Sequence, residues 1–189
     1  MSKLLVINGS PRKNGSDAAM VKKAVEMAEK YGYESEILWA YDLDLNGCRA
    51  CMACKKTGEC VQKDGMNDVI AKIRDSDMIL FATPVYFLAE TGPIKTFIDR
   101  MYPMMRMNPD RTISHNVGKL KKASVIVTCG APDGNMVFAN ILTRFFNVLK
   151  MFGVTDVSGG IVPGAMPDTV LDSPYAKEYF SNLEFQLEM

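Results

Sequence analysis

Short apolar runs alternate with helical patterns along the chain, and this alternation constrains the fold more than any other sequence feature. Residues 3–8 form a continuous apolar run closed by Gly9, which is typical of a strand buried on both faces. Further strands are predicted at 34–40, 78–83, 123–129 and 155–162. A helix that connects two parallel strands must pack back onto their sheet. The chain is therefore predicted to form an α/β fold with a parallel sheet covered on both sides.

Apolar residues at helical spacing predict the helices between these strands. Val21, Ala24, Val25 and Ala28 follow an i, i+3, i+4, i+7 pattern that stops at Gly32. Other helices are predicted around 66–73, from Pro93 onward, over 135–152 and from Ser173 onward. Residues 102–120 form the one long irregular piece in this prediction. Its methionines, Met104, Met105 and Met107, fit either local core filling or an adaptable lid or subunit contact.

The composition fits one domain spanning residues 1–189. Hydrophobic residues make up 48% and charged residues 23% of the chain, and no repeat, linker or low-complexity segment divides it. Lys and Arg together number 22, as do Asp and Glu, so attraction of the whole chain to nucleic acid or an anionic membrane is not expected. The apolar runs are too short for a signal peptide or a membrane span. We therefore expect a cytoplasmic protein.

The segment GSPRKNGS, residues 9–16, lies between the first predicted strand and the first predicted helix. A turn at this place exposes backbone N–H groups at a helix N-terminus, where the helix dipole favours an anion, and adds hydroxyl groups and cations. The segment has neither the Walker nor the G-x-G-x-x-G spacing, which disfavours ATP and a dinucleotide bound in the Rossmann manner. An ordinary polar turn is the alternative. The candidate phosphate-binding residues are Ser10, Arg12, Lys13, Asn14, Gly15 and Ser16.

Two later loops are expected at the same edge, since ligands of open α/β sheets bind outside the carboxyl ends of the strands. Residues 84–87 follow the third strand and offer apolar and aromatic surface to a flat ring. Residues 129–130 follow the fourth, and the glycine there allows close approach of backbone to a ligand. The alternatives are that the aromatic pair belongs to the core and that the glycine belongs to a plain turn. The candidates are Pro84, Val85, Tyr86, Phe87, Cys129 and Gly130.

The segments GSPR (9–12), PVY (84–86) and KTFIDR (95–100) resemble the flavodoxin-like NAD(P)H-dependent FMN reductases, and more narrowly the iron–sulfur flavoproteins. The resemblance extends over about residues 1–132. It implies a flavodoxin-like three-layer sandwich whose five-stranded parallel sheet has the order 2-1-3-4-5. It also implies FMN, with its phosphate held by Ser10, Arg12 and Ser16 and its ring against the two later loops.

Asp17 departs from this family pattern, which usually has a small hydroxyl or amide residue at that position. A carboxylate beside a phosphate weakens binding by like-charge repulsion unless its side chain points away. The orientation of Asp17 therefore bears directly on whether the loop can hold FMN.

Cys48, Cys51, Cys54 and Cys60 form a C-x2-C-x2-C-x5-C pattern in the loop after the second predicted strand. Three cysteines at successive x2 spacing let a tight loop wrap its thiolates around one cubane, as in bacterial ferredoxins. Iron–sulfur flavoproteins use this arrangement for a [4Fe–4S] cluster, which the resemblance implies here. Zinc and unligated or redox-active thiols are the alternatives. Because the second strand neighbours the first in a 2-1-3 order, we expect flavin and cluster to share one edge of the sheet.

A local group of cations accompanies the cysteines, although the chain as a whole is neutral. Such a group either offsets an anionic cluster, docks an acidic electron carrier such as ferredoxin, or is simply a solvated face. Its members are Arg49, Lys55, Lys56 and Lys63.

These features favour an FMN-dependent oxidoreductase that passes electrons between a donor, NAD(P)H or ferredoxin, and a small-molecule acceptor. No catalytic side chain is assigned, because hydride transfer to flavin requires no protein acid and the chain has a single histidine, His115. The alternatives are a clusterless NAD(P)H:FMN or quinone reductase, a non-enzymatic flavodoxin-like electron carrier and a regulatory thiol sensor. A homodimer or homotetramer is expected from the resemblance.

Overall fold

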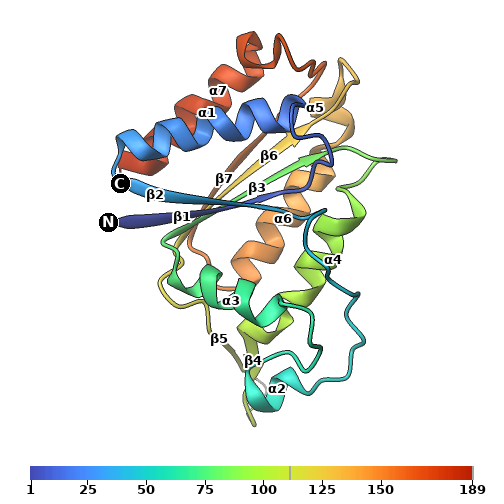
Figure 1. Cartoon of the computed structure of the whole chain (residues 1–189), viewed down its shortest axis with the longest axis vertical. Coiled ribbons are helices and arrows are strands. Elements are labelled where there is room, and N and C mark those ends of the chain that lie inside the picture. Colours follow the sequence, from blue (N-terminus) through green and yellow to red (C-terminus); the bar gives the residue numbers. More distant parts are fainter. Residues whose placement is uncertain (111, 189) are drawn as a thin grey trace.

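A computed structural model describes residues 1–110 and 112–188, and its centre is a five-stranded parallel sheet (Figure 1). The strand order is β2-β1-β3-β6-β7, which is the predicted 2-1-3-4-5 order once the strands of this sheet are counted alone. A separate antiparallel pair joins two short strands. The strands of the main sheet are β1 (Ser2–Asn8), β2 (Tyr33–Trp39), β3 (Met78–Pro84), β6 (Lys122–Thr128) and β7 (Asp156–Val162), and the pair is β4 (Met105–Met107) with β5 (Ile113–His115).

Helices cover both faces of the sheet, so the central strands are buried on both sides (Figure 1). One face carries α1 (Ser16–Lys30) and α7 (Pro174–Glu188), whose apolar residues pack on Leu4 and Val6. The other face carries α3 (Met66–Asp75), α4 (Gly92–Arg100) and α6 (Ala139–Met151). No helix among these residues is long and apolar enough to cross a membrane. The remaining short elements are α2 (Cys54–Thr57), η1 (Tyr102–Met104), α5 (Gly134–Val137) and η2 (Val170–Asp172).

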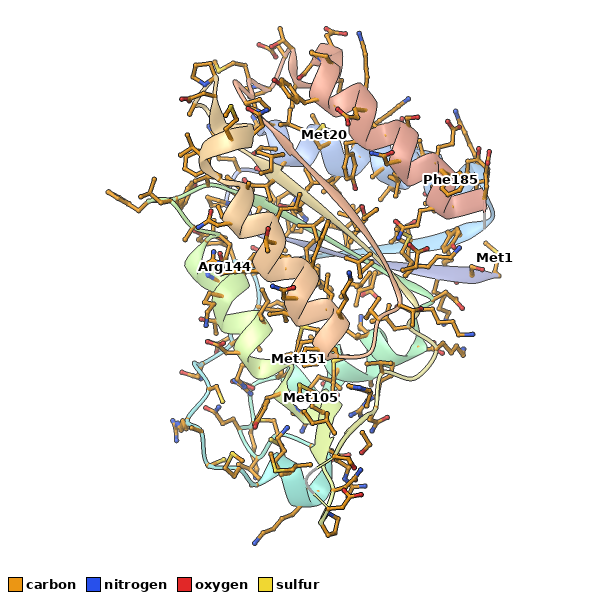
Figure 2. All side chains as sticks on the ribbon, turned by 180° about the vertical axis from the view of Figure 1, so that it is seen from behind. Met1, Met20, Met105, Arg144, Met151 and Phe185 are labelled. Atoms are coloured by element: carbon orange, nitrogen blue, oxygen red, sulfur yellow. The ribbon has the colours of Figure 1, made fainter. Side chains whose placement is uncertain are left out.

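Two segments differ from the sequence prediction. The helix predicted over 135–152 is two helices, α5 and α6, because Phe138 between them lies outside the helical region at φ −108° and ψ 13° and buries its ring. The irregular piece 102–120 contains η1 and the β4–β5 hairpin, with Met104 and Met105 buried and Met107 exposed. Two of its three methionines therefore fill the core, and Figure 2 labels Met105 in this lower part of the molecule.

Direct backbone contacts hold the loops after β1, β3 and β6 side by side at the carboxyl edge of the sheet. Gly9 N–H donates to Ala82 O at 2.7 Å, and Val85 N–H donates to Thr128 O at 2.9 Å. Gly9 has no room for a side chain, since a Cβ there would lie 2.2 Å from Ile94 Cγ1 at the start of α4. The close approach of α4 to this loop therefore depends on a glycine.

Candidate functional site

The loop between β1 and α1 is a compact polar turn whose rim faces solvent. Ser10 N–H donates to Asn8 Oδ1 at 2.9 Å, and Arg12 N–H donates to Ser10 Oγ at 3.3 Å. Ser10, Gly15 and Ser16 are buried beneath the rim, while Arg12, Lys13 and Asn14 are exposed. Ser16 Oγ also donates to Ala165 O at 3.2 Å, which ties the start of α1 to the chain beyond β7. The turn thus presents cations and the N-terminus of α1 at the carboxyl edge of the sheet.

Asp17, whose orientation the sequence left open, points into the protein and away from this rim. Its side chain is buried, and Thr128 Oγ1 at the end of β6 donates a hydrogen bond to Asp17 Oδ2 at 3.0 Å. Asp17 Oδ1 has no partner among the described residues. Burial raises the pKa of Asp17 to about 6, while the bond from Thr128 and the charge of Arg12 act in the opposite direction.

The loop after β3 is a tight two-residue hairpin whose tip extends from the molecule (Figure 1). Tyr86 N–H donates to Ala89 O at 2.9 Å and Ala89 N–H donates back at 3.1 Å. Phe87 and Leu88 lie between them with φ of 44° and 66°, a conformation that L-residues adopt at a cost. Pro84 is buried and Val85 half-buried, but Tyr86, Phe87 and Leu88 are exposed. The core alternative for Tyr86 and Phe87 is therefore wrong.

An ion pair braces this hairpin against the helix layer. Arg144, which projects from α6 and is labelled in Figure 2, pairs with the carboxylate of Glu90 in the hairpin loop. The Glu90 side chain is only 7% exposed, so the pair is partly shielded from water. The hairpin is held in place by α6 and by Val85, while its aromatic tip is left in solvent.

The turn after β6 joins the same edge. Cys129 N–H donates to Val162 O at 3.1 Å, the thiol is buried, and burial raises its pKa. Gly134 must be a glycine here, since a Cβ would lie 2.1 Å from Cys129 Sγ. Gly130 is exposed, and a Cβ built on it meets nothing within 4 Å, so the backbone there is open to an approaching group.

The cysteine segment lines a second candidate site of the molecule. Its four cysteines are free thiols that line one pocket, together with Arg100 of α4 and Tyr102 of η1. Cys48 and Cys51 are exposed, Cys60 is half-buried and Cys54 is buried, which raises the pKa of Cys54. Within residues 1–110 and 112–188, no three Cys, His, Asp or Glu side chains are grouped closely enough to hold a single metal ion.

A buried ion pair that the sequence did not reveal lies beside this pocket. The side chains of Arg100 and Asp64 are 1% and 5% exposed. Arg100 Nη1 donates to Asp64 Oδ2 at 2.5 Å and Nη2 donates to Asp64 Oδ1 at 2.7 Å. This two-point pairing lowers the pKa of Asp64 to about 2.

From the end of β2 the cysteine segment runs down the molecule to α2, which lies at the lower end in Figure 1. Helix α4 connects it with the loop between β1 and α1, since Ile94 in the first turn of α4 lies against Gly9 and Arg100 at its end lines the cysteine pocket. A shared edge for flavin and cluster stays a prediction. One expectation about the segment needs correction. Lys55 is not part of a free basic rim, since its Nζ donates to the carbonyls of Tyr102 and Met105 at 2.7 and 2.6 Å.

A parallel sheet of this order, with a solvent-facing polar turn after its first strand, is the flavodoxin-like arrangement. The chain belongs to the NADPH-dependent FMN reductase family, whose sequence model matches residues 2–162. It is accordingly an FMN-dependent oxidoreductase, as the sequence resemblance implied.

Individual relatives agree with this assignment. The chain is 34% identical over 175 residues to an iron–sulfur flavoprotein of Archaeoglobus fulgidus, covering 93% of this chain and 74% of that one. Among solved structures, an NAD(P)H:quinone oxidoreductase from Methanothermobacter marburgensis superposes with a TM-score of 0.76, at 13% identity over 98% of this chain and 97% of that chain. An FMN-dependent NADH-azoreductase from Bacillus anthracis in complex with FMN gives 0.73, at 12% identity over 99% and 98%. These two structures show the shared fold.

The raised pKa of Asp17 predicts a stability that depends on pH. The pKa of this carboxyl group is about 4 in the unfolded chain and about 6 in the folded one. Between these values the unfolded chain has released the proton that the folded chain keeps, so stability falls as pH rises through this window and stays low above it. Asp17→Asn is expected to remove this fall and to be more stable than the wild type at pH 7, in urea unfolding measured from pH 4 to 8.

Asp68→Asn is the control for this measurement, since Asp68 is an exposed acid in the first turn of α3. Like Asp17→Asn, the Asp68→Asn substitution removes the interaction of a carboxylate with a helix N-terminus, but the charge that it removes is exposed. A gain at pH 7 that is equal in the two variants would contradict the account of Asp17.

The backbone of the hairpin tip predicts a second effect. Replacing Phe87 and Leu88 by Asn and Gly, which suit positive φ, is expected to raise the free energy of unfolding by about 1–2 kcal/mol. Flavin affinity is expected to fall, because the aromatic surface is lost. The control Phe185→Gln removes an exposed aromatic side chain from α7 and is expected to change stability by less than about 0.5 kcal/mol. A double variant that is less stable than the wild type would show that the tip is not strained.

Proposed function

We propose that the three loops at the carboxyl edge bind FMN, with its phosphate at the β1–α1 turn and its ring between the later two loops. The observation that carries this proposal is the contact of these loops through Gly9, Val85 and Cys129, beside the N-terminus of α1. Asp17 supports it because its carboxylate turns inward to Thr128.

Each loop has a distinct task in this proposal. Ser10, Arg12, Lys13, Asn14, Gly15 and Ser16 hold the phosphate through backbone N–H groups, hydroxyl groups and positive charge. The flat ring packs against Pro84, Val85, Tyr86 and Phe87 on one side and meets the Cys129–Gly130 turn on the other. Of the backbone N–H groups of residues 85–87, those of Val85 and Tyr86 already donate to Thr128 O and Ala89 O, which leaves that of Phe87 to stabilise negative charge on a reduced ring.

The flavin supplies the electron chemistry, exchanging two electrons with one partner and single electrons with another. We propose NAD(P)H or a ferredoxin as donor and a small molecule as acceptor. The chain itself supplies position, exclusion of water and electrostatic stabilisation, and we assign no side chain as a catalytic acid or base. The alternative of an electron carrier without enzymatic activity is not supported, because the family is one of reductases.

The four cysteines are proposed to hold an iron–sulfur cluster, with [4Fe–4S] as the fitting type. Four free thiols around one pocket match the donor set of a cubane, and Arg100 Nη2 donates to Cys60 Sγ at 3.3 Å, a hydrogen bond of the kind that orients cluster ligands. A single zinc ion would take the same four thiolates, so zinc is the competing occupant of this pocket. The similarity to an iron–sulfur flavoprotein supports the cluster.

We also propose a homodimer or homotetramer, as the family resemblance implies. The clusterless reductase remains the second candidate function, favoured if the thiols prove to be unligated.

The phosphate site predicts a difference between FMN and riboflavin. Arg12→Met is expected to weaken FMN binding by about ten- to a hundredfold, since a charge-assisted hydrogen bond contributes roughly 1.5–3 kcal/mol. Riboflavin, which has no phosphate, is expected to bind the variant and the wild type equally. Fluorescence titration of the apoprotein with both ligands measures this difference.

Lys119→Met is the matched control for the FMN titration. It removes a cation that pairs with Asp75, which lies near the amino ends of the strands. FMN affinity is expected to stay unchanged. An Arg12→Met variant that loses FMN and riboflavin affinity alike would place the effect on the fold rather than on the phosphate.

The cluster site predicts a difference between two buried cysteines. Cys54→Ser is expected to lose most of the iron bound after anaerobic reconstitution, because a thiolate ligand is removed. Cys129 is the other buried cysteine, and it lies in the turn after β6. The variant Cys129→Ser is expected to keep the iron. Iron and sulfide analysis with visible absorption provides the measurement. Equal iron in both variants would contradict the assignment of the four ligands.

A further inference from the structure

Arg100 is the most deeply buried cation beside the cysteine pocket. It is the last residue of α4, on the same face as Ile94 and Phe97, and its side chain is 1% exposed. A guanidinium so deeply buried is stable only when its charge is paired and its N–H groups have acceptors. Asp64 supplies the opposite charge at two points.

The guanidinium connects the two ends of the cysteine loop. Arg100 Nη1 donates to Asn46 O at 2.6 Å, two residues before Cys48, and pairs with Asp64, four residues after Cys60. Asn46 N–H in turn donates to Asp64 Oδ2 at 3.0 Å. One side chain of α4 therefore closes the loop that carries all four thiols.

Cys60 is held at both its side chain and its backbone. Arg100 Nη2 donates to Cys60 Sγ at 3.3 Å. Asn67 accepts from Cys60 N–H and donates to Cys60 O, both at 2.8 Å. The fourth cysteine lies five intervening residues from the third, so its position depends on these contacts rather than on the tight x2 spacing of the others.

One N–H group of the Arg100 guanidinium has no hydrogen-bond acceptor among the described residues. This group, at Nε, is buried, and Arg100 itself lines the cysteine pocket. Burying an N–H donor without an acceptor costs free energy of folding. Such a donor in a native protein therefore calls for an explanation, and an ion or ligand bound beside it is one. An anionic sulfur group in the pocket is an acceptor of the right charge.

We propose that Arg100 is the positioning residue of the cysteine site. It closes the loop between Asn46 and Asp64, orients Cys60, and places a fixed positive charge and an N–H donor beside an anionic iron–sulfur group. This proposal rests on the cluster proposed above. A positive charge and hydrogen bonds to sulfur stabilise the form that carries one more electron, so they raise the reduction potential.

The test compares two substitutions that separate charge from geometry. Arg100→Lys keeps the charge but loses the two-point pairing, and Arg100→Met loses both. Each variant is reconstituted anaerobically with iron and sulfide, and iron release to a chelator and the midpoint potential under dithionite titration are measured. We expect both variants to release iron at least ten times faster than the wild type. The potential is expected to fall in Arg100→Met and to be largely restored in Arg100→Lys.

Lys95→Met is the matched control on the same helix, since Lys95 is exposed and pairs only with Asp99 among the described residues. It is expected to leave iron release and potential unchanged. If Arg100→Met leaves Asp64 as an unpaired buried charge and does not fold, the double variant Arg100→Met/Asp64→Leu removes both charges and is measured for iron release instead. FMN binding reports whether each variant is folded.

Hydrogen exchange separates failure of this proposal from failure of the cluster proposal. In metal-free protein, Arg100→Lys is expected to speed exchange at least tenfold in peptides that cover Asn46 and Cys60, with exchange in β1 unchanged. Wild-type protein that takes up no iron would contradict the cluster, while exchange would still test closure of the loop by Arg100. Variants with wild-type iron release and potential, or with unchanged exchange in residues 46–64, would overturn the role of Arg100.

Discussion

Parallel pairing of β1, β3 and β6 is the constraint on which the proposed flavin site depends. Because the three strands run in one direction, their following loops emerge at the same edge, and hydrogen bonds from Gly9, Val85 and Cys129 fix those loops to neighbouring strands. The buried bond from Thr128 to Asp17 adds a link between β6 and the first turn of α1. The site therefore needs no long ordered loop of its own.

The cysteine region depends on a different interaction. It has little regular structure beyond the four residues of α2, and its shape follows from the buried pair of Arg100 and Asp64. The loops at the carboxyl edge are thus held by backbone hydrogen bonds to the sheet. The cysteine pocket is held by the C-terminus of α4 and by the side-chain contacts of Arg100 and Asp64. Helix α4 connects the two, since Ile94 in its first turn lies against Gly9 and its last residue, Arg100, lines the cysteine pocket.

The strands could be predicted from sequence because strands buried on both faces appear as continuous apolar runs, and residues 3–8 and 78–83 are such runs. The loops at the carboxyl edge followed from topology alone. The exposure of Phe87 could not be predicted, because an apolar side chain gives no sign of which way a hairpin points. Strand order likewise fixed where the cysteine loop begins but not where it ends.

The network of Arg100 was beyond sequence reasoning for a related reason. Its partners lie 36 to 54 residues away along the chain, so only tertiary structure brings them together. One signal was present: Arg100 falls three residues after Phe97, on the apolar face of α4, where an exposed arginine is not expected. A charge on a buried helix face indicates a buried partner, although it does not say which one.

We propose that one chain carries both a flavin site at the carboxyl edge of the sheet and an iron–sulfur pocket at the four cysteines. Quantification of FMN, iron, sulfide and zinc in the anaerobically purified protein tests this pairing. We expect about one FMN with about four iron and four sulfide ions per chain. A yellow protein with FMN but without iron and sulfide, or with a single zinc ion, would contradict it.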